Sequence, residues 1–305
     1  MRVKNYIIEN YIVLGKKFYS ERNIKRALEY FKKAYALTKG EKDIELLLDM
    51  ALIYDELDEF ALAEAKYREI LAIDSEDSRA FYGLGIIYDT REENEKAVEF
   101  YEKAIELNPD YNKAYFFLAN VYEDLERFED AIGCYKKVIG LNKDDFWSYT
   151  NLSSIYEKLE EYELAFESIK QSLRIEPEHY MALFNMGVIL GKLNKEEESI
   201  KYYKRSIQEN INYPYSYLNL SIIYKNRELF DIAIKIISGG ILNNPEASFL
   251  YYNRACFYVH VNKMVEALKD LDKAVYISPD YVKYIVEDEE LYPLKVFPEY
   301  KEIVK

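Results

Sequence analysis

The stretch from Ser78 to Tyr111 constrains the fold most, because variants of it recur along nearly the whole chain. Its large apolar residues include Phe81, Leu84 and Tyr88, at the spacing of one helix face, and a second such stripe follows a short polar segment. Pro109 has no amide hydrogen with which to continue the second helix. The pattern therefore predicts two antiparallel helices joined by a turn, repeated as a stack.

The repeats keep one register. Counting Ser78 as position 1, the repeats start near residues 8, 44, 78, 112, 146, 180, 214 and 248, and the first has two extra residues near Lys39–Asp43. Position 8 is always small, as is position 20. The residues are Gly15, Ala51, Gly85, Ala119, Ser153, Gly187, Ser221 and Ala255 at position 8, and Ala27, Ala63, Ala97, Ala131, Ala165, Ser199, Ala233 and Ala267 at position 20. Small residues at fixed positions indicate close contact of helix backbones.

An aromatic residue, then Leu-Gly and Tyr, followed by Ala, an aromatic residue, Ala and Pro, resembles the tetratricopeptide (TPR) repeat. The resemblance implies an all-α fold, a right-handed α-solenoid (superhelix) of about eight TPR helix-turn-helix repeats over residues 1–281. Residues 282–305 are expected to form a capping helix and a C-terminal tail. The cap is expected as one helix from Tyr281 to Tyr292, ended by Pro293, with the tail folded back on the last helices. We expect one elongated domain.

Charge and cysteine content restrict the partners and the compartment. The net charge of −14 disfavours nucleic acid or an anionic membrane as the partner. Residues 44–179 hold fourteen Lys and Arg against thirty-three Asp and Glu, a net charge of −19. Cys134 and Cys256 lie too far apart in the stack for a disulfide. The first residues lack the uninterrupted apolar core of a signal peptide, so a cytoplasmic location is expected.

The sequence offers little for catalysis. Cys256 and His260 stand four residues apart on one predicted helix, but two residues without a further ligand are more consistent with a buried thiol and a surface imidazole than with a metal site. No phosphate-binding glycine loop or nucleophile elbow occurs. Arg254 takes a position filled by Leu or Met in the other repeats, and we assign it a structural role. We predict no enzyme activity, no cofactor and no metal.

The candidate binding residues lie on a second stripe of each first helix, at positions 2, 5, 6, 9, 12 and 13, which lines the ligand groove in TPR arrays. Position 6 holds asparagine in four consecutive repeats, at Asn151, Asn185, Asn219 and Asn253. An asparagine amide both donates and accepts hydrogen bonds, so such a row can bind the backbone of an extended peptide. It resembles the asparagine ladders of TPR superhelices and importin-like solenoids. The alternative is a row inherited as family consensus.

Aromatic residues on the same stripe extend this prediction. The predicted peptide-binding set adds Asn120, Trp147, Phe184, Tyr215, Phe249 and Tyr252. Exposed apolar side chains at such positions mark an interaction site, and Trp147 is a candidate hot spot. The alternative is that these rings pack between adjacent first helices.

Taken with the resemblance, these residues predict a non-catalytic scaffold or adaptor that binds an extended peptide segment of a partner protein in the groove of repeats 5 to 8. The lysine and arginine residues of the carboxylate clamp found in some TPR domains are absent at positions 5 and 6. Two alternatives stay open. The chain could self-associate into a homo-oligomer through its ends or tail, or it could act as a regulatory subunit whose acidic repeats 2–5 bind a basic partner.

Overall fold

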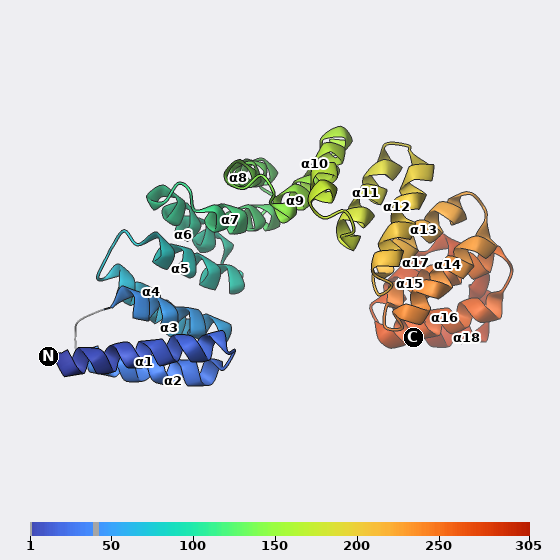
Figure 1. The fold of residues 1–305 in the computed structure, drawn as a ribbon. Helices are drawn as coiled ribbons and strands as arrows, with labels where there is room; N and C mark the ends of the chain where they lie inside the picture. The colour runs from blue at the N-terminus through green and yellow to red at the C-terminus, as the bar shows by residue number, and fades with distance from the viewer. Residues whose placement is uncertain (1, 39–42) are drawn as a thin grey trace. The chain divides into compact units, whose positions relative to one another are not determined.

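A computed structural model describes residues 2–38 and 43–305, and all regular structure in these residues is helical (Figure 1). The predicted all-α fold of helix-turn-helix repeats is therefore confirmed. The chain forms two compact units, residues 1–143 and 144–305. The two extra residues predicted in repeat 1 fall largely outside the described residues.

The first unit contains four helical hairpins. In each hairpin the two helices pack against each other, and the second helix also contacts the first helix of the next hairpin. The helices are α1 (Arg2–Ser20), α2 (Ile24–Thr38), α3 (Ile44–Glu56), α4 (Phe60–Leu71), α5 (Ser78–Thr90), α6 (Asn94–Leu107), α7 (Asn112–Asp124) and α8 (Phe128–Leu141).

The second unit contains four more hairpins and a C-terminal segment. Its helices are α9 (Phe146–Lys158), α10 (Tyr162–Ile175), α11 (Tyr180–Lys192), α12 (Glu196–Glu209), α13 (Pro214–Asn226), α14 (Phe230–Asn243), α15 (Ser248–His260), α16 (Met264–Ile277), α17 (Tyr281–Glu287), the 3₁₀-helix η1 (Glu289–Val296) and α18 (Pro298–Ile303). The first helices of repeats 2 to 8 begin at residues 44, 78, 112, 146, 180, 214 and 248, in the register read from the sequence.

Several first helices begin at an aspartate that caps them. Asp43 accepts hydrogen bonds from the backbone N–H groups of Glu45 and Leu46, and Asp77 does the same for the start of α5. Asp145 accepts from the N–H of Ser148 at the start of α9. These side chains satisfy amide groups that the helix itself leaves unpaired, which fixes where each first helix begins.

Each hairpin turn contains one residue in the left-handed region, with φ between 56° and 60°. These residues are Arg22, Asp58, Glu92, Glu126, Glu160, Asn194, Glu228 and Asn262. In repeat 4 the N–H of Arg127 reaches the carbonyl of Tyr122 at 2.8 Å, and the N–H of Glu126 reaches that of Glu123 at 3.0 Å. This is the Schellman termination of a helix, formed here without glycine.

The core of each unit runs between the paired helices. Position 20 is buried in all eight repeats, and position 24 supplies the largest buried rings, those of Phe31, Tyr67, Tyr101 and Tyr135. Two of the tyrosine hydroxyls donate hydrogen bonds to a polar side chain on the first helix of the same hairpin. Tyr67 donates to Asp55 at 2.9 Å, and Tyr135 donates to Asn120 at 2.5 Å. A buried ring with a hydrogen-bonded hydroxyl satisfies both the apolar and the polar part of a tyrosine.

The C-terminal segment differs from the predicted single helix. The helix that starts at Tyr281 ends at Glu287, Asp288 is extended, and Pro293 lies inside η1 instead of ending a helix. Its apolar residues Leu291 and Leu294 are fully buried against the last repeat. A helix that continued through Asp288 would place these leucines differently. Their burial therefore explains why α17 ends at Glu287. Tyr300 and Ile303 of α18 join the same core.

Candidate functional site

The candidate site is one stripe on the first helices of the second unit, which we call the ladder face. It consists of positions 2, 5, 6, 9, 12 and 13 of α9, α11, α13 and α15. These four helices contact one another in chain order. Residues at the same position of successive repeats therefore lie in a row along the face.

The four predicted asparagines are all half-buried on the ladder face. Asn185 donates to the hydroxyl of Ser154 on α9 at 3.4 Å, and Asn219 donates to the hydroxyl of Tyr203 on α12 at 3.2 Å. Asn253 donates to the backbone carbonyl of Phe249 at 2.8 Å, and Asn151 also has an interaction partner. Each side-chain amide has two N–H donors and one acceptor oxygen, and each of the three bonds uses only one of the donors. The bonds hold the amides in place and leave them capacity for a ligand.

A pocket of about 290 Å³ opens on the ladder face between α9 and α11. Its lining combines apolar side chains with an amide, two hydroxyls and two charged groups: Ser153, Ser154, Glu157, Lys158, Phe184, Asn185, Val188 and Ile189. Two predicted site residues, Phe184 and Asn185, thus share one pocket. Its size suits a single amino-acid side chain, and Asn185 lies in its lining.

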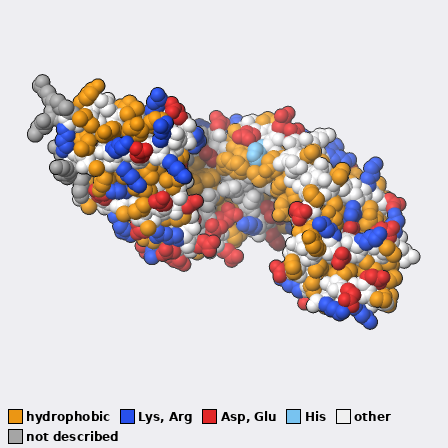
Figure 2. Space-filling model, turned by 90° about the horizontal axis from the view of Figure 1, so that it is seen from below, with side chains coloured by type: hydrophobic (Ala, Val, Ile, Leu, Met, Phe, Trp, Pro, Cys, Tyr) orange, Lys and Arg blue, Asp and Glu red, His pale blue; other side chains and the backbone are white. Residues whose placement is uncertain are grey.

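Aromatic rings continue along one edge of the ladder face. Trp147 is 45% exposed and Tyr215 is 48% exposed, and the Tyr215 ring stacks on that of Phe249 with centroids 5.2 Å apart. Phe184 is half-buried and lies 6.4 Å from Tyr215. Figure 2 shows hydrophobic side chains at the surface of one face of the molecule, mixed with charged ones.

Sequence reasoning missed three rings that complete this edge. His179 lies 5.4 Å from Trp147, Tyr180 lies 4.9 Å from Tyr213, and Tyr213 lies 5.3 Å from Phe184, all between ring centroids. His179 and Tyr213 each directly precede a first helix, one repeat apart. An aromatic residue that recurs directly before a first helix was the available signal. It lies outside the helical stripe on which the prediction was based.

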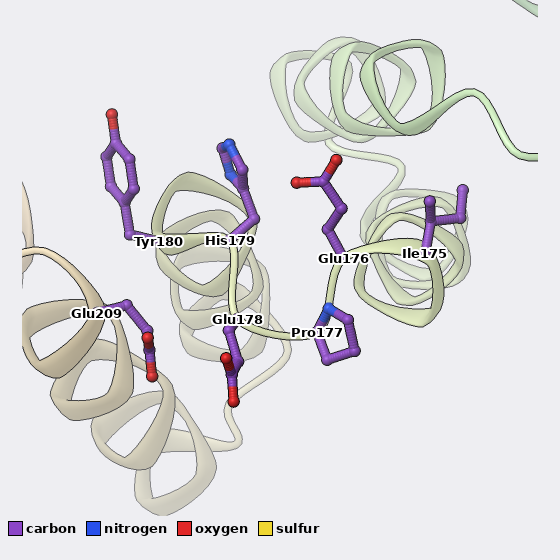
Figure 3. Close-up of a pocket in the computed structure, with 7 residues that line it drawn as sticks. All are labelled: Ile175, Glu176, Pro177, Glu178, His179, Tyr180 and Glu209. Atoms are coloured by element: carbon purple, nitrogen blue, oxygen red, sulfur yellow. The ribbon is translucent and has the colours of Figure 1, made fainter.

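His179 belongs to a loop that surrounds a shallow pocket of about 660 Å³ (Figure 3). The side chains of Glu176, His179 and Tyr180 extend to one side of the loop, whereas those of Glu178 and Glu209 extend to the other. Burial lowers the pKa of His179, although Glu176 opposes the shift. Its Nδ1 is buried and has no hydrogen-bond partner among the described residues. The ring is therefore neutral near pH 7 and acts mainly as an aromatic surface.

Two predicted residues are engaged elsewhere. The hydroxyl of Tyr252 donates to Asp288 Oδ2 at 2.5 Å, and its ring lies 5.4 Å from Tyr281, so the C-terminal segment contacts it. Asn120 belongs to the first unit, where it accepts the hydrogen bond from Tyr135. The second unit therefore brings together the other eight predicted residues, with Tyr252 at the end contacted by the chain itself.

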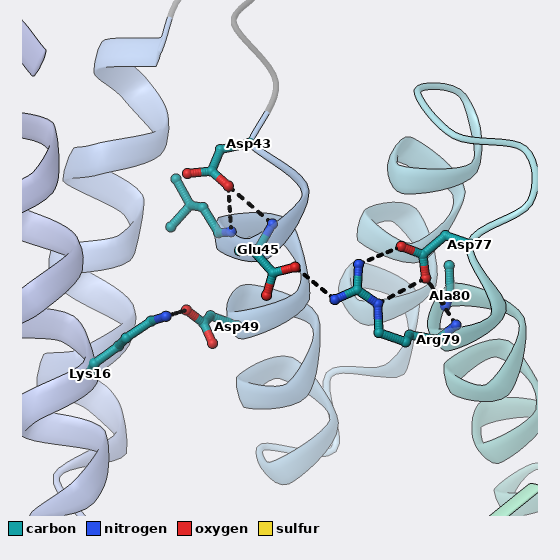
Figure 4. Close-up of polar contacts among 8 residues, drawn as sticks. Lys16, Asp43, Glu45, Asp49, Asp77, Arg79 and Ala80 are labelled. Atoms are coloured by element: carbon teal, nitrogen blue, oxygen red, sulfur yellow. Dashed lines mark hydrogen bonds and ion pairs between the residues drawn. The ribbon is translucent and has the colours of Figure 1, made fainter. Parts of the chain in front are cut away.

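The equivalent stripe of the first unit carries charged groups instead (Figure 4). Lys16 approaches Asp49 at 3.4 Å, and Arg79 bridges Glu45 and Asp77 at 2.6 Å each. Burial raises the pKa of Asp55 to about 6, although the hydrogen bond from Tyr67 opposes the shift. Burial also raises the pKa values of Asp49 and Asp89.

No group of three or more His, Cys, Asp or Glu in residues 2–38 and 43–305 could hold a metal ion. Cys134 and Cys256 are free thiols, and burial raises the pKa of Cys134 to about 12 and that of Cys256 further. No described helix combines the length and apolar character needed to cross a membrane.

Repeated helical hairpins, each packed on the next within its unit, define a helical-repeat protein. The tetratricopeptide repeat matches residues 78–111, 113–145, 148–179, 182–210 and 250–281, together just over half of the chain. The chain therefore belongs to the tetratricopeptide repeat family, as the sequence resemblance indicated. The Sel1 repeat also matches residues 14–38 and 237–256. Proteins of this family generally act as scaffolds for protein interactions.

Solved structures agree with this fold, whereas a comparison with curated proteins found no match. A tetratricopeptide repeat protein from Parabacteroides merdae has a TM-score of 0.63 at 16% identity, covering 86% of this chain and 97% of that one. The APC/C hetero-tetramer Cut9-Hcn1 has a TM-score of 0.59 at 17% identity, covering 92% and 53%. Pseudomonas aeruginosa pilF has a TM-score of 0.57 at 18% identity, covering 72% and 96%. At these identities the likeness concerns the fold alone.

Proposed function

We propose that the protein is a non-catalytic scaffold or adaptor that binds an extended peptide segment of a partner protein along the ladder face of repeats 5 to 8. The observation that carries this proposal is the pocket that Phe184 and Asn185 share, with Asn151 and Asn219 at the same position of the neighbouring repeats. The pocket would receive one ligand side chain while the amides bind the ligand backbone.

The expected energetics fit a moderate, sequence-tolerant interaction. Each hydrogen bond between an asparagine and the ligand backbone would contribute about 0.5–1.5 kcal/mol net. Burial of apolar ligand groups against Trp147 and Tyr215 would add about 25 cal/mol for each Å² removed from water. An extended strand exposes one N–H and one C=O per residue. The asparagine row would therefore bind the ligand backbone whatever its sequence, and the aromatic rings would select among ligand side chains.

The test starts with a displayed library of random extended peptides, selected on the full-length protein. The selected peptides are then titrated against the Asn185→Ala/Asn219→Ala variant, with Asn212→Ala, an exposed loop position, as the matched control. We expect the double variant to bind at least about tenfold more weakly, which corresponds to the loss of two hydrogen bonds. Equal binding by the double variant and the control would refute the role of the ladder.

A basic partner on the first unit is a second candidate function. The stripe there holds Glu45, Asp49, Asp55 and Asp89, and within the described residues no group donates a hydrogen bond to the buried Oδ1 of Asp55. Binding of an oligolysine peptide that disappears between 50 and 300 mM salt (about 14 to 6 Å Debye length) would support it. Binding that is insensitive to salt would count against it.

The free cysteines fit a reducing compartment, so we infer a cytoplasmic location. Fractionation of the native cell would check it.

A further inference from the structure

The C-terminal segment touches the ladder face with two carboxylates, two residues apart. Asp288 Oδ2 accepts a hydrogen bond from the Tyr252 hydroxyl at 2.5 Å and lies 3.6 Å from Cys256 Sγ. Glu290 Oε1 accepts from Lys225 Nζ at 2.5 Å, and Glu290 Oε2 lies 3.1 Å from His260 Nε2. Tyr252, Cys256 and His260 occupy positions 5, 9 and 13 of repeat 8, and Lys225 occupies position 12 of repeat 7. All four are ladder-face positions.

The two acidic residues stand at the junction of α17 and η1. Asp288 is extended, with φ −73° and ψ 114°, between the end of α17 and the start of η1. Its Oδ1 also accepts the N–H of Glu290 at 2.9 Å, which holds the two acidic residues in a fixed relation. The chain thus places two acidic side chains of its own, Asp288 just before η1 and Glu290 in its first turn, on the face proposed for a ligand.

The two carboxylates are held differently. Asp288 lies beside the buried Cys256 and just ahead of the buried Leu291, so it cannot leave without disturbing the core. Glu290, in contrast, has a side chain 35% exposed, and those of Lys225 and His260 are 25% and 36% exposed. Partly solvated ion pairs contribute little stability. Rotation of the Glu290 side chain alone would therefore vacate Lys225 and His260.

The two basic groups are arranged to bind a carboxylate. The imidazole of His260 stacks on Phe230 with centroids 4.6 Å apart and an interplanar angle of 12°, which fixes the direction of Nε2. A carboxylate accepts only if that nitrogen carries a proton. Lys225 supplies three N–H donors and a full charge from the neighbouring first helix. With Glu290 rotated away, a lysine and a histidine would face solvent at this end of the ladder face.

We propose that Lys225 and His260 form a carboxylate-binding subsite, filled in the free protein by Glu290, that receives an acidic side chain of the partner's extended segment. The inference rests on the proposed function, because it assigns the chemistry of the ligand at one end of the same face. The partner segment is therefore acidic at one position, and Glu290 is its internal competitor.

The experiment compares peptides selected from one displayed random library by full-length wild-type protein, Glu290→Gln, and Glu290→Gln/Lys225→Met. The matched control is Glu289→Gln, an exposed neighbour. We expect peptides selected on Glu290→Gln to be enriched in Asp or Glu at one fixed position. They should bind that variant about threefold to fivefold more tightly than wild type, in proportion to the weak ion pair removed. Glu289→Gln should behave as wild type, and the added Lys225→Met change should abolish the acidic enrichment.

Three results would contradict the proposal. If the selected peptides bind every form without an acidic preference, the subsite is overturned and the proposed function stands. If no peptide is selected on any of the forms, both are overturned. Concentration-dependent dimerisation of Glu290→Gln that Lys225→Met removes would mean that a second copy supplies the carboxylate, which overturns the assignment to a partner. Thermal unfolding of each variant confirms that it is folded before selection.

Discussion

Arg254 and Asp270 form a two-point ion pair across repeat 8, with Nε 2.7 Å from Oδ2 and Nη2 2.8 Å from Oδ1. The third guanidinium nitrogen donates to the hydroxyl of Ser238 at 2.8 Å. Burial raises the pKa of Asp270, whereas Arg254 opposes that shift. The arginine that replaces the usual leucine is thus paired inside the fold, in agreement with its predicted structural role.

Removing one partner of this pair should be costly. In the Asp270→Ala variant a buried guanidinium would lack its counter-charge, and we expect a loss of about 3 kcal/mol. The Arg254→Leu/Asp270→Leu variant removes both charges and restores the leucine of other repeats, so it should recover most of that loss. Urea unfolding followed by circular dichroism measures both. A double variant no more stable than the single one would contradict this account.

Asp55 should make stability depend on pH in a defined window. Its pKa is raised from the ordinary 3.8 to about 6, so the folded protein keeps this proton where the unfolded chain releases it. The resulting stabilisation is complete below pH 3.8 and is lost as the pH rises to about 6.

The Asp55→Asn variant should therefore gain stability over wild type at pH 7 and little at pH 4. We expect a gain of about 1 kcal/mol, discounted because the carboxyl is partly solvated. Chemical denaturation at the two pH values measures the difference, with Asp110→Asn, at an exposed loop position, as the control. An equal gain at both pH values would show that Asp55 is not responsible.

Gly83 should not tolerate a side chain. A Cβ at this position would lie 2.2 Å from Cζ of Tyr67, whose ring is buried, so the ring or the helix would have to move. We expect Gly83→Ala to lose about 1–3 kcal/mol. Gly133→Ala is the matched control, because a Cβ there meets nothing within 4 Å, and it should gain up to about 1 kcal/mol from helix propensity. Unfolding midpoints that move in the same direction would disprove the packing argument.

Glycine at the left-handed position of a hairpin turn should stabilise the protein. Glu126 adopts φ 56° at the C-terminal end of α7, where a non-glycine residue is strained and a negative charge opposes the helix dipole. Glu126→Gly should raise stability by about 1 kcal/mol, as measured by the thermal midpoint. Glu129→Gly, inside α8, should lower it. If both changes destabilise the protein, the turn is not the source of strain.

Trp147 and Tyr252 should differ in a binding assay. Trp147 is 45% exposed, so Trp147→Ala should weaken selected peptides by about tenfold or more and should lower the unfolding midpoint only through its contacts with Phe146 and His179. Tyr252→Phe removes the hydrogen bond to Asp288, so it should cost about 1 kcal/mol of stability. Its peptide affinity should change little. The reverse pattern would place the ligand at Tyr252 instead.

The fold was readable from the sequence because its signals are local and repeated. Small residues at positions 8 and 20 and prolines after second helices give the helix pairs without any long-range contact. The path of the C-terminal segment was not readable. It depends on burial of Leu291 and Leu294 against repeat 8, and the helical spacing of residues 281–292 contains no information on that contact.

The candidate site was readable only in part. The asparagine row follows from register alone, and the structure places it on one face of the second unit. The rings of His179 and Tyr213 precede their helices, so helical periodicity did not include them. The contact between Glu290 and Lys225 joins residues far apart in the chain, and no local pattern indicates it.

The aromatic ring at position 24 also joins some repeats to the next one. Tyr67 packs on Gly83 of the next repeat, Tyr101 lies 6.4 Å from the Phe117 ring, and Tyr203 binds the Asn219 amide. These three boundaries thus have three different contacts, although the hairpins share one backbone. The repeats are alike but not interchangeable. A protein in which two of them were exchanged would keep the hairpins but lose these side-chain contacts between neighbouring repeats.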